Sequence, residues 1–87
     1  MLDEFLNQKV VLDFASAFVC LGTLKRYDET FLELRNADLH DLRDTDASRE
    51  NYIAASQATG IKRNRKRIFV TRADVIALSL LEDVVDE

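Results

Sequence analysis

A dense run of basic side chains is the feature of this sequence most able to bind a charged ligand. Five positive charges fall within six consecutive residues, namely Lys62, Arg63, Arg65, Lys66 and Arg67. Clusters of this density bind phosphate groups, with an affinity that depends strongly on salt and little on sequence. Without the run, the chain has seven basic and sixteen acidic residues, a balance of −9 against −4 overall. The run therefore predicts a phosphate-binding surface, with a solvated loop that balances an acidic protein as the equal alternative.

Side chains able to act as nucleophiles, bases or metal ligands are sparse. The sequence does not place the single histidine, His40, beside a nucleophile such as Ser16, Ser48 or Cys20. His40 and its neighbouring aspartates form a weak metal pattern, because their spacing is loose and the chain has no second histidine. A glycine-rich phosphate loop is absent from the sequence. We therefore predict no enzymatic activity, no cofactor and no metal site.

Length and composition are those of one small intracellular domain. The chain has 87 residues, of which 47% are hydrophobic and 32% are charged. Its single cysteine, Cys20, cannot form an internal disulfide and lies in an apolar run, which favours a small core residue. No apolar stretch approaches the roughly 18–20 residues that span a bilayer, and the acidic start differs from a secretory signal. We expect one domain over residues 1–87, a cytoplasmic location and no membrane partner.

Hydrophobic periodicity predicts a short helix and two strands at the start of the chain. Apolar residues at helical spacing indicate the helix over about residues 2–7. Alternation then indicates strands over Lys9–Ser16 and Phe18–Arg26. Gly22 lies midway along the second strand, where glycine usually marks a bend or bulge. A strand that bends sharply in its middle is typical of a small sheet that curls on itself.

A turn and a third strand follow. The turn covers Tyr27–Thr30, and we expect Asp28 to stabilise it by accepting backbone hydrogen bonds. The strand covers Phe31–Leu42, and its apolar residues change phase midway. A period-2 pattern that slips by one residue predicts a bulge, here near Arg35–Asn36.

An inserted segment over residues 44–65 separates the third strand from the last two. Its alanine-rich part, Ala47–Thr59, follows candidate N-cap residues and ends at Gly60, a natural C-cap. We predict a short helix here. A long hairpin arm is the alternative, because residues that tolerate strands occur within it.

The last two strands are expected at Ile68–Thr71 and Val75–Leu81, before an acidic, solvated tail over residues 82–87. Both faces of these strands are apolar, so one face can enter the core while the other needs cover. We therefore predict a homo-oligomer. Its expected interface residues are Ile68, Phe69, Val70, Val75, Ile76, Ala77 and Leu78.

The order of these elements and two sets of residues resemble the Sm and Sm-like (LSm) family, the superfamily that includes bacterial Hfq. The first family motif combines glycine, leucine, an aromatic position, aspartate and an apolar strand, and it is matched by Gly22, Leu24, Tyr27, Asp28, Leu32, Leu34 and Ala37. The second motif joins an apolar strand, an arginine–glycine pair and a valine-rich strand, and it is similar to residues 68–76 with Arg72 as the arginine. The resemblance extends from Leu2 to Leu81.

This resemblance implies a mainly β fold, namely a small, strongly bent, five-stranded antiparallel open barrel of the SH3 type. It also implies a cyclic homo-oligomer of about five to seven subunits, with single-stranded RNA as a partner. Neighbouring subunits would pair residues 68–71 with residues 75–81. In such a ring, Arg72 would contact bases near the pore, Phe31 would offer a stacking face, and the basic run over residues 62–67 would attract the RNA backbone.

Two positions depart from the family pattern. The asparagine with which uridine-binding members read a base falls at Phe31 or Leu32, and neither side chain can make that hydrogen bond. The arginine–glycine pair falls at Arg72–Ala73 or, without a gap, at Thr71–Arg72. We therefore expect an RNA-binding ring that acts as a chaperone or scaffold. The alternatives are the same ring as a protein–protein assembly module without RNA, and a DNA-associated accessory protein.

Overall fold

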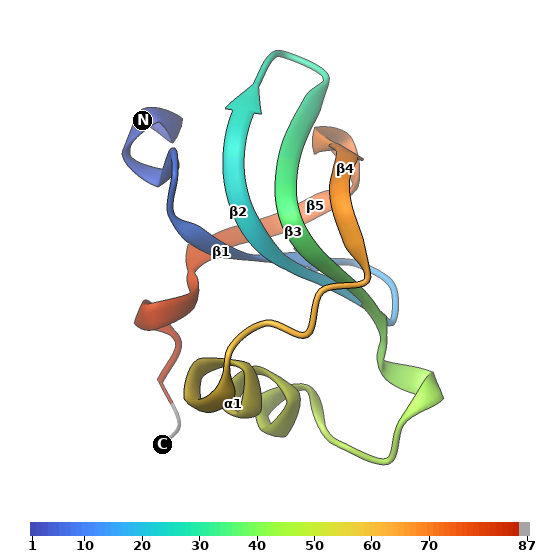
Figure 1. The fold of residues 1–87 in the computed structure, drawn as a ribbon. Coiled ribbons are helices and arrows are strands. Elements are labelled where there is room, and N and C mark those ends of the chain that lie inside the picture. Colours follow the sequence, from blue (N-terminus) through green and yellow to red (C-terminus); the bar gives the residue numbers. More distant parts are fainter. Residues whose placement is uncertain (86–87) are drawn as a thin grey trace.

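Five antiparallel strands form one sheet in the order β4-β3-β2-β1-β5 (Figure 1). The computed structural model describes residues 1–85. The strands are β1 (Lys9–Phe14), β2 (Phe18–Tyr27), β3 (Phe31–Asp41), β4 (Arg65–Thr71) and β5 (Val75–Leu80). β4 pairs with β3 and β5 pairs with β1, so these two strands form opposite edges of an open sheet. The predicted class, a mainly β, five-stranded antiparallel open barrel, is confirmed.

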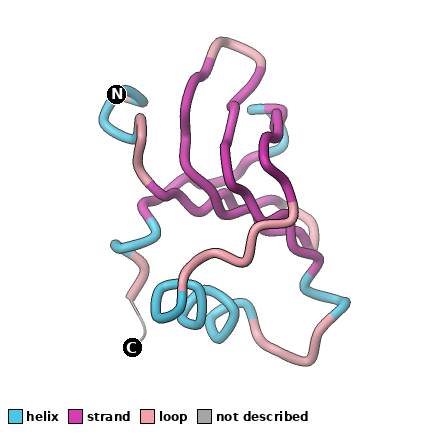
Figure 2. The backbone as a smooth tube through the Cα atoms, viewed as in Figure 1, coloured by secondary structure: helices cyan, strands magenta, loops and turns pink. Residues whose placement is uncertain are grey.

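The strong curvature of β2 and β3, visible in Figure 2, has two local causes. The pairing register of β2 on β3 shifts between Leu21 and Thr23, and a Cβ added to Gly22 would lie 3.0 Å from the Cβ of Ala37. Glycine therefore lets the two bent strands approach closely. In β3, Asn36 has a positive φ of 51°, which asparagine adopts more readily than most residues. The bend expected at Gly22 and the bulge expected near Asn36 are both present.

β1 and the first half of β2 are buried on both faces. One apolar cluster fills the inside of the bend and consists of Val10, Leu12, Cys20, Leu24, Leu32, Leu34, Ala37 and Val70. A second cluster lies between the sheet and the inserted helix and consists of Val11, Val19, Leu21, Ile53 and Leu81. Alternate residues of β1 and β2 enter different clusters, because side chains on a strand point to opposite faces. This explains why the apolar runs Val10–Leu12 and Val19–Leu21 are continuous.

The inserted segment contains the helix α1 (Arg49–Thr59), so the predicted helix is confirmed and the hairpin arm is wrong. The Oγ atom of Ser48 accepts a hydrogen bond from the backbone N–H of Asn51, which caps the N-terminus. The helix ends at Gly60, whose φ of 93° suits glycine and whose N–H donates to the carbonyl of Ser56. α1 lies beside the sheet at the end away from the β2–β3 turn (Figure 1).

Both ends of the chain form short turns. The N-terminal helix expected over residues 2–7 is a single 3-10 turn, η1 (Leu2–Phe5). After β5, η4 (Leu81–Asp83) is a further 3-10 turn that leads into the predicted acidic tail, and its first residue, Leu81, is buried. Gln57 of α1 donates to the carbonyls of Leu81 and Val84, both at 2.8 Å, so this part of the tail is fastened to the helix. Residues 86–87 of that prediction lie outside the described residues.

One expectation about the C-terminal strands needs correction. β4 begins at Arg65 instead of Ile68, because its pairing with β3 continues to Ala37 opposite Arg65. The last two strands follow each other closely, but they pair with different partners at opposite edges. The connection between them is a 3-10 turn, η3 (Arg72–Asp74).

Candidate functional site

The turn between β2 and β3 is stabilised by its own aspartate. The Oδ1 atom of Asp28 accepts hydrogen bonds from the backbone N–H groups of Thr30 and Phe31, at 2.8 and 2.7 Å. These donors, Phe31 first and Thr30 second, hold the pKa of Asp28 below its usual value. The N–H of Asp28 donates in turn to the carbonyl of Phe31 at 3.0 Å. The carboxylate thus sets the backbone shape of the turn, as expected.

Arg72 joins this turn to the one after β4. Its backbone N–H donates to the carbonyl of Thr30 at 2.8 Å, and its guanidinium donates to the carbonyl of Asp28. The side chain of Arg72 therefore bonds to a backbone oxygen. The two turns therefore lie side by side. We call Tyr27–Phe31 together with Arg72–Asp74 the turn pair.

The side chains at the first turn differ in what they offer to a ligand. Phe31 is 42% exposed, whereas Leu32 is 3% exposed and belongs to the core. Tyr27 donates a hydrogen bond from its hydroxyl to the carboxylate of Asp3, which raises the pKa of the phenol. Of the two positions at which the family's asparagine could fall, only Phe31 faces solvent. Tyr27 fastens η1 to the turn.

A buried carboxylate on the outer face of β3 was not singled out from the sequence. Glu33 is 2% exposed. Its Oε1 accepts a hydrogen bond from Nε of Arg26, its Oε2 accepts one from Nε of Arg35, both at 2.7 Å, and Nε of Arg67 lies 3.5 Å from Oε2. The bond from Arg35, followed by that from Arg26, lowers the pKa of Glu33 to about 2.

Two phenylalanine rings adjoin these charges. Phe69 lies opposite Glu33 across β3 and β4 and is 49% exposed. Its ring meets that of Phe31 edge to face with 6.3 Å between centroids, and the guanidinium carbon of Arg67 lies 4.6 Å from its centroid. We call this surface the arginine–aromatic face, and its residues are Arg26, Phe31, Glu33, Arg35, Arg67 and Phe69.

A hollow of about 220 Å³ connects the turn pair with the arginine–aromatic face. Its lining includes Tyr27 and Asp28 from the turn pair, and Glu33 and Phe69 from the face. Phe31 lines the hollow and belongs to both surfaces. The two surfaces are therefore continuous at this end of the sheet.

The basic run does not form one loop, which corrects the sequence-based picture. Lys62 and Arg63 precede β4, whereas the last three basic residues belong to β4. Arg63 donates to the side-chain oxygen of Asn36 at 2.6 Å, and Arg65 donates to the carbonyl of Asn64 at 3.1 Å. Arg67 faces Glu33, while Lys66 points to the opposite face because neighbouring strand residues alternate. All five side chains are exposed, but in different directions.

The residues expected at the oligomer interface lie on the two edge strands and divide by burial. Val70 is buried, and Ile68, Val75 and Leu78 pack partly against the same core. The remaining three, Phe69, Ile76 and Ala77, are exposed. β4 thus turns one face to this chain's own core and the other, with Phe69, to solvent, while β5 exposes the neighbouring residues Ile76 and Ala77.

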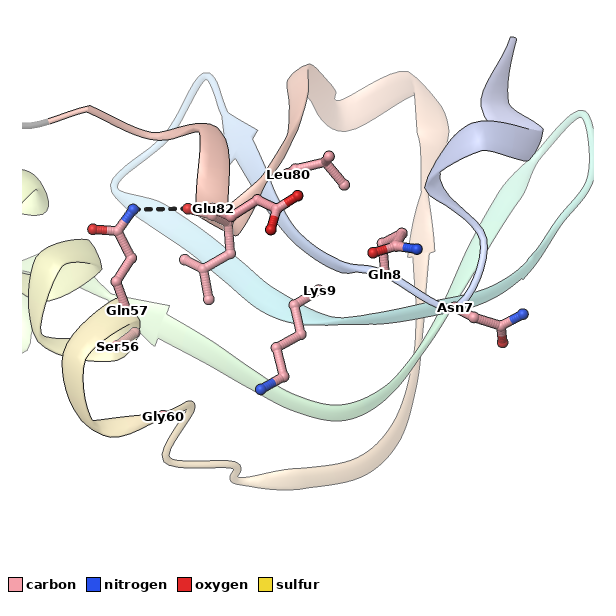
Figure 3. A pocket seen from close by; sticks show the side chains of 9 residues that line it. Asn7, Gln8, Lys9, Ser56, Gln57, Gly60, Leu80 and Glu82 are labelled. Atoms are coloured by element: carbon pink, nitrogen blue, oxygen red, sulfur yellow. Dashed lines mark hydrogen bonds between the residues drawn. The ribbon is translucent and has the colours of Figure 1, made fainter.

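A larger and more polar hollow of about 640 Å³ lies between the C-terminal end of α1 and the start of β1. Figure 3 shows Lys9 extending into this space and Gln57 hydrogen-bonded at the opposite wall. Glu82 also lines the hollow. With one cation and one anion at its walls, it has no clear preference for a charged ligand.

The remaining reactive side chains serve the fold. Burial raises the pKa of Cys20 to about 12, which keeps the thiol protonated and unreactive. His40 stacks on Tyr52 of α1 with 4.1 Å between ring centroids, and the Tyr52 hydroxyl donates to Asp38 at 2.5 Å. Within residues 1–85, no group of three or more His, Cys, Asp or Glu side chains is placed to hold a metal ion. None of the helices described is long and apolar enough to cross a membrane.

Comparison with known proteins bears on the fold. No protein-family model and no curated protein matches the sequence. Among solved structures, an Sm protein of Pyrococcus abyssii, determined in complex with a uridine heptamer, superposes with a TM-score of 0.62. The match covers 91% of this chain and 90% of the Pyrococcus chain, at 17% sequence identity. This chain has the Sm fold. The expected resemblance is therefore confirmed over nearly the whole chain, and the conserved feature is the backbone architecture.

Proposed function

We propose that this Sm-like protein binds single-stranded RNA as a cyclic homo-oligomer and acts as a chaperone or scaffold. The observation that supports this most directly is the turn pair, in which Arg72 and the exposed Phe31 lie at adjacent turns of an Sm fold. Guanidinium and aromatic groups stack on RNA bases and tolerate different sequences. The Pyrococcus Sm protein of the same fold was solved with a uridine heptamer.

The two open sheet edges support the proposed ring. β4 has a free edge on one side of the sheet and β5 has one on the other, and β5 carries the exposed apolar side chains Ile76 and Ala77. Unpaired edges with apolar side chains favour pairing with another chain. If residues 68–71 of one subunit pair with residues 75–80 of the next, the contact is heterologous and can close into a ring.

Size-exclusion chromatography with light scattering and native mass spectrometry test the ring. We expect a mass corresponding to about five to seven subunits at micromolar concentration. A monomer that persists at this concentration would contradict the ring, although it would leave the fold assignment unchanged.

Filter binding with oligo-U and oligo-A at low and moderate salt tests RNA binding. We expect micromolar or tighter affinity that falls steeply as salt rises, because phosphate contacts release counterions. Arg72→Gln should weaken binding, and reversing the charges of the exposed Lys62, Arg63 and Lys66 should reduce the salt dependence. Arg43→Gln is the matched control, since Arg43 is 71% exposed and its partner is Asp41. Absence of RNA binding at low salt would refute the proposed function.

A protein–protein assembly module remains the second candidate, and one observation favours it. Position 32 is a buried leucine and position 31 a phenylalanine, so the turn cannot read a uridine edge through an asparagine. A ring of the expected mass that binds neither oligonucleotide would support this candidate. Duplex DNA added as a competitor in the same assay tests the DNA-associated alternative.

A further inference from the structure

The arginine–aromatic face carries more positive charge than its own structure needs. Arg26, Arg35 and Arg67 form ion pairs with a single carboxylate, that of Glu33, within the described residues 1–85. Three positive charges therefore meet one negative charge. A charge-assisted pair is complete with one arginine, so the remaining charge is available to an anion from outside.

The exposed fractions of Glu33 and of the three arginine side chains show which of them face solvent. Glu33 is 2% exposed, whereas the side chains of Arg26, Arg35 and Arg67 are 67%, 46% and 48% exposed. The carboxylate thus lies beneath the guanidinium groups and binds them through their inner donors. A guanidinium has five N–H donors in a rigid plane, and those directed outward can still bind a phosphate.

The aromatic part of the face is equally open. Phe31 and Phe69 are 42% and 49% exposed and meet edge to face. Large apolar rings exposed as a pair cost solvation free energy, and such patches commonly mark binding sites. Exposed rings next to guanidinium groups form the kind of surface on which unpaired bases stack, with phosphates bound beside them.

We propose that the arginine–aromatic face is an additional contact surface for single-stranded RNA. Bases would stack on Phe31 and Phe69, phosphates would bind the outward donors of the arginines, and Glu33 would be the residue that positions these arginines. This proposal rests on the proposed function and extends it beyond the turn pair. One RNA strand can reach both surfaces, because the hollow of about 220 Å³ lined by Phe31 joins them.

The charges and the exposed rings of this face favour single-stranded RNA over other partners. A second copy presenting the same face would bring arginine against arginine, which is repulsive. Addition of a strand to the free edge of β4 uses hydrogen bonds in the plane of the sheet, whereas these side chains stand perpendicular to it. The face therefore stays accessible in the proposed ring. An acidic peptide would satisfy the charges but not the stacking surface, so it becomes a competitor in the test.

The test measures fluorescence anisotropy of a labelled oligo-U of about 12 nucleotides, within the site sizes of small β-barrels. Phe69→Ala and Arg35→Gln should each weaken binding by about fivefold or more, as expected for loss of one stacking or phosphate contact. Arg43→Gln should change affinity by less than about twofold, because Arg43 lies outside the face. Circular dichroism melting verifies that each variant is folded.

The effect of Glu33→Gln on RNA affinity shows whether Glu33 positions the arginines or only lowers the positive charge of the face. The substitution removes a negative charge, so arginines that act through charge alone would bind RNA more tightly. If Glu33 positions the guanidinium groups, binding becomes weaker instead, by about twofold to tenfold, the range of one net hydrogen bond. Tighter binding by Glu33→Gln would overturn the positioning role.

The outcomes distinguish this proposal from the proposed function. If the wild-type protein binds no oligo-U, the proposed function and this extension both fail. If Arg72→Gln weakens binding while Phe69→Ala and Arg35→Gln do not, only the arginine–aromatic face is refuted. A poly-glutamate peptide that competes as well as unlabelled RNA would show anion binding without stacking and would also overturn it. Photocrosslinking of a 4-thiouridine oligonucleotide to the wild-type protein, mapped to Phe31 or Phe69, supports the proposal without any variant.

Discussion

At the scale of single residues, Glu33 and Gly22 determine the local structure of the β2–β3 region. Glu33 stays ionised beneath two hydrogen-bonded arginines, which makes its burial tolerable. Gly22 lets β2 and β3 cross at close range. Both residues determine how the outer face of the sheet is presented.

The ion pairs of Glu33 predict an acid-sensitive contribution to stability. Its pKa is lowered from 4.5 to about 2 by the arginines, Arg35 first, so the folded state favours the carboxylate. The contribution is complete above about pH 4.5 and is lost as the pH falls towards 2. We expect urea unfolding of the wild-type protein to become progressively easier across this window.

In Glu33→Gln, the same unfolding series should show a flatter pH profile between pH 4.5 and 2. Some slope should remain, because Asp41, whose pKa is lowered by Arg43, is present in both proteins. Parallel profiles for the two proteins across this window would contradict a stabilising role of the Glu33 ion pairs.

The close approach at Gly22 predicts that Gly22→Ala destabilises the protein. The added methyl carbon would lie 3.0 Å from the Cβ of Ala37 and 3.0 Å from Cδ2 of Leu34, in a fully packed core. Overpacking of this kind costs about 1–3 kcal/mol of unfolding free energy. Equilibrium unfolding in urea measures it. The double variant Gly22→Ala/Ala37→Gly should recover part of the loss, whereas an unchanged midpoint in Gly22→Ala would show that the strands can separate freely.

At the scale of elements, α1 is built into the fold instead of projecting as an arm. Ile53 enters the second apolar cluster, and Arg49 forms an ion pair with Asp13 of β1. Gln57 bonds to the backbone that follows β5. The helix therefore covers one face of the sheet, while the turn pair and the arginine–aromatic face lie away from these contacts.

The cap of α1 offers a test of how far the helix supports the fold. Ser48→Ala removes the acceptor for the backbone N–H of Asn51 and should cost about 1 kcal/mol of unfolding free energy. Ser48→Asn preserves a capping oxygen and should be nearly neutral. Urea unfolding monitored by circular dichroism compares the two. Equal losses in both variants would indicate that the hydroxyl acts through something other than capping.

At the scale of the whole molecule, two sheet edges are left unpaired within the described residues 1–85. The strands β4 and β5 each pair on one side only, and they lie at opposite ends of the strand order. A sheet with one open edge at each end can continue from copy to copy, since each copy offers both halves of the contact. Ile76 and Ala77 are exposed on one of these edge strands, β5.

Ile76 provides a test of that assembly. We expect Ile76→Asp to dissociate the proposed ring while leaving the protomer folded, because this side chain is 69% exposed within one chain. Val85→Asp is the matched control, since Val85 is 71% exposed and lies outside the edge strands. Light scattering gives the masses and circular dichroism the folding. Unchanged mass for both variants would exclude the β5 edge from the interface.

The sequence by itself determined the strands, the inserted helix and the fold. The alternation of apolar and polar residues over residues 9–42 was enough to locate the first three strands. Each strand there buries at least one face, and burial of one face imposes a period of two residues. Gly22 and the phase slip near Asn36 located the bends, because Gly22 leaves room for the close approach of Ala37 and the bulge places Asn36 at a positive φ. The helix was recognisable over Ala47–Thr59 because its composition and its C-terminal glycine are local signals, whereas the structure begins it at Arg49 with Ser48 as the N-cap.

Only the tertiary structure decided which charges meet. Arg26, Glu33 and Arg67 come from three strands, and their contact follows from a register that is set by turns and bulges far along the chain. Pairing also decided that β4 begins at Arg65 and that β4 and β5 occupy opposite edges. Side-chain type specifies what a strand can bury, whereas strand order specifies its neighbours. For that reason a six-residue basic run, conspicuous in the sequence, divides between faces, while an inconspicuous glutamate organises a surface.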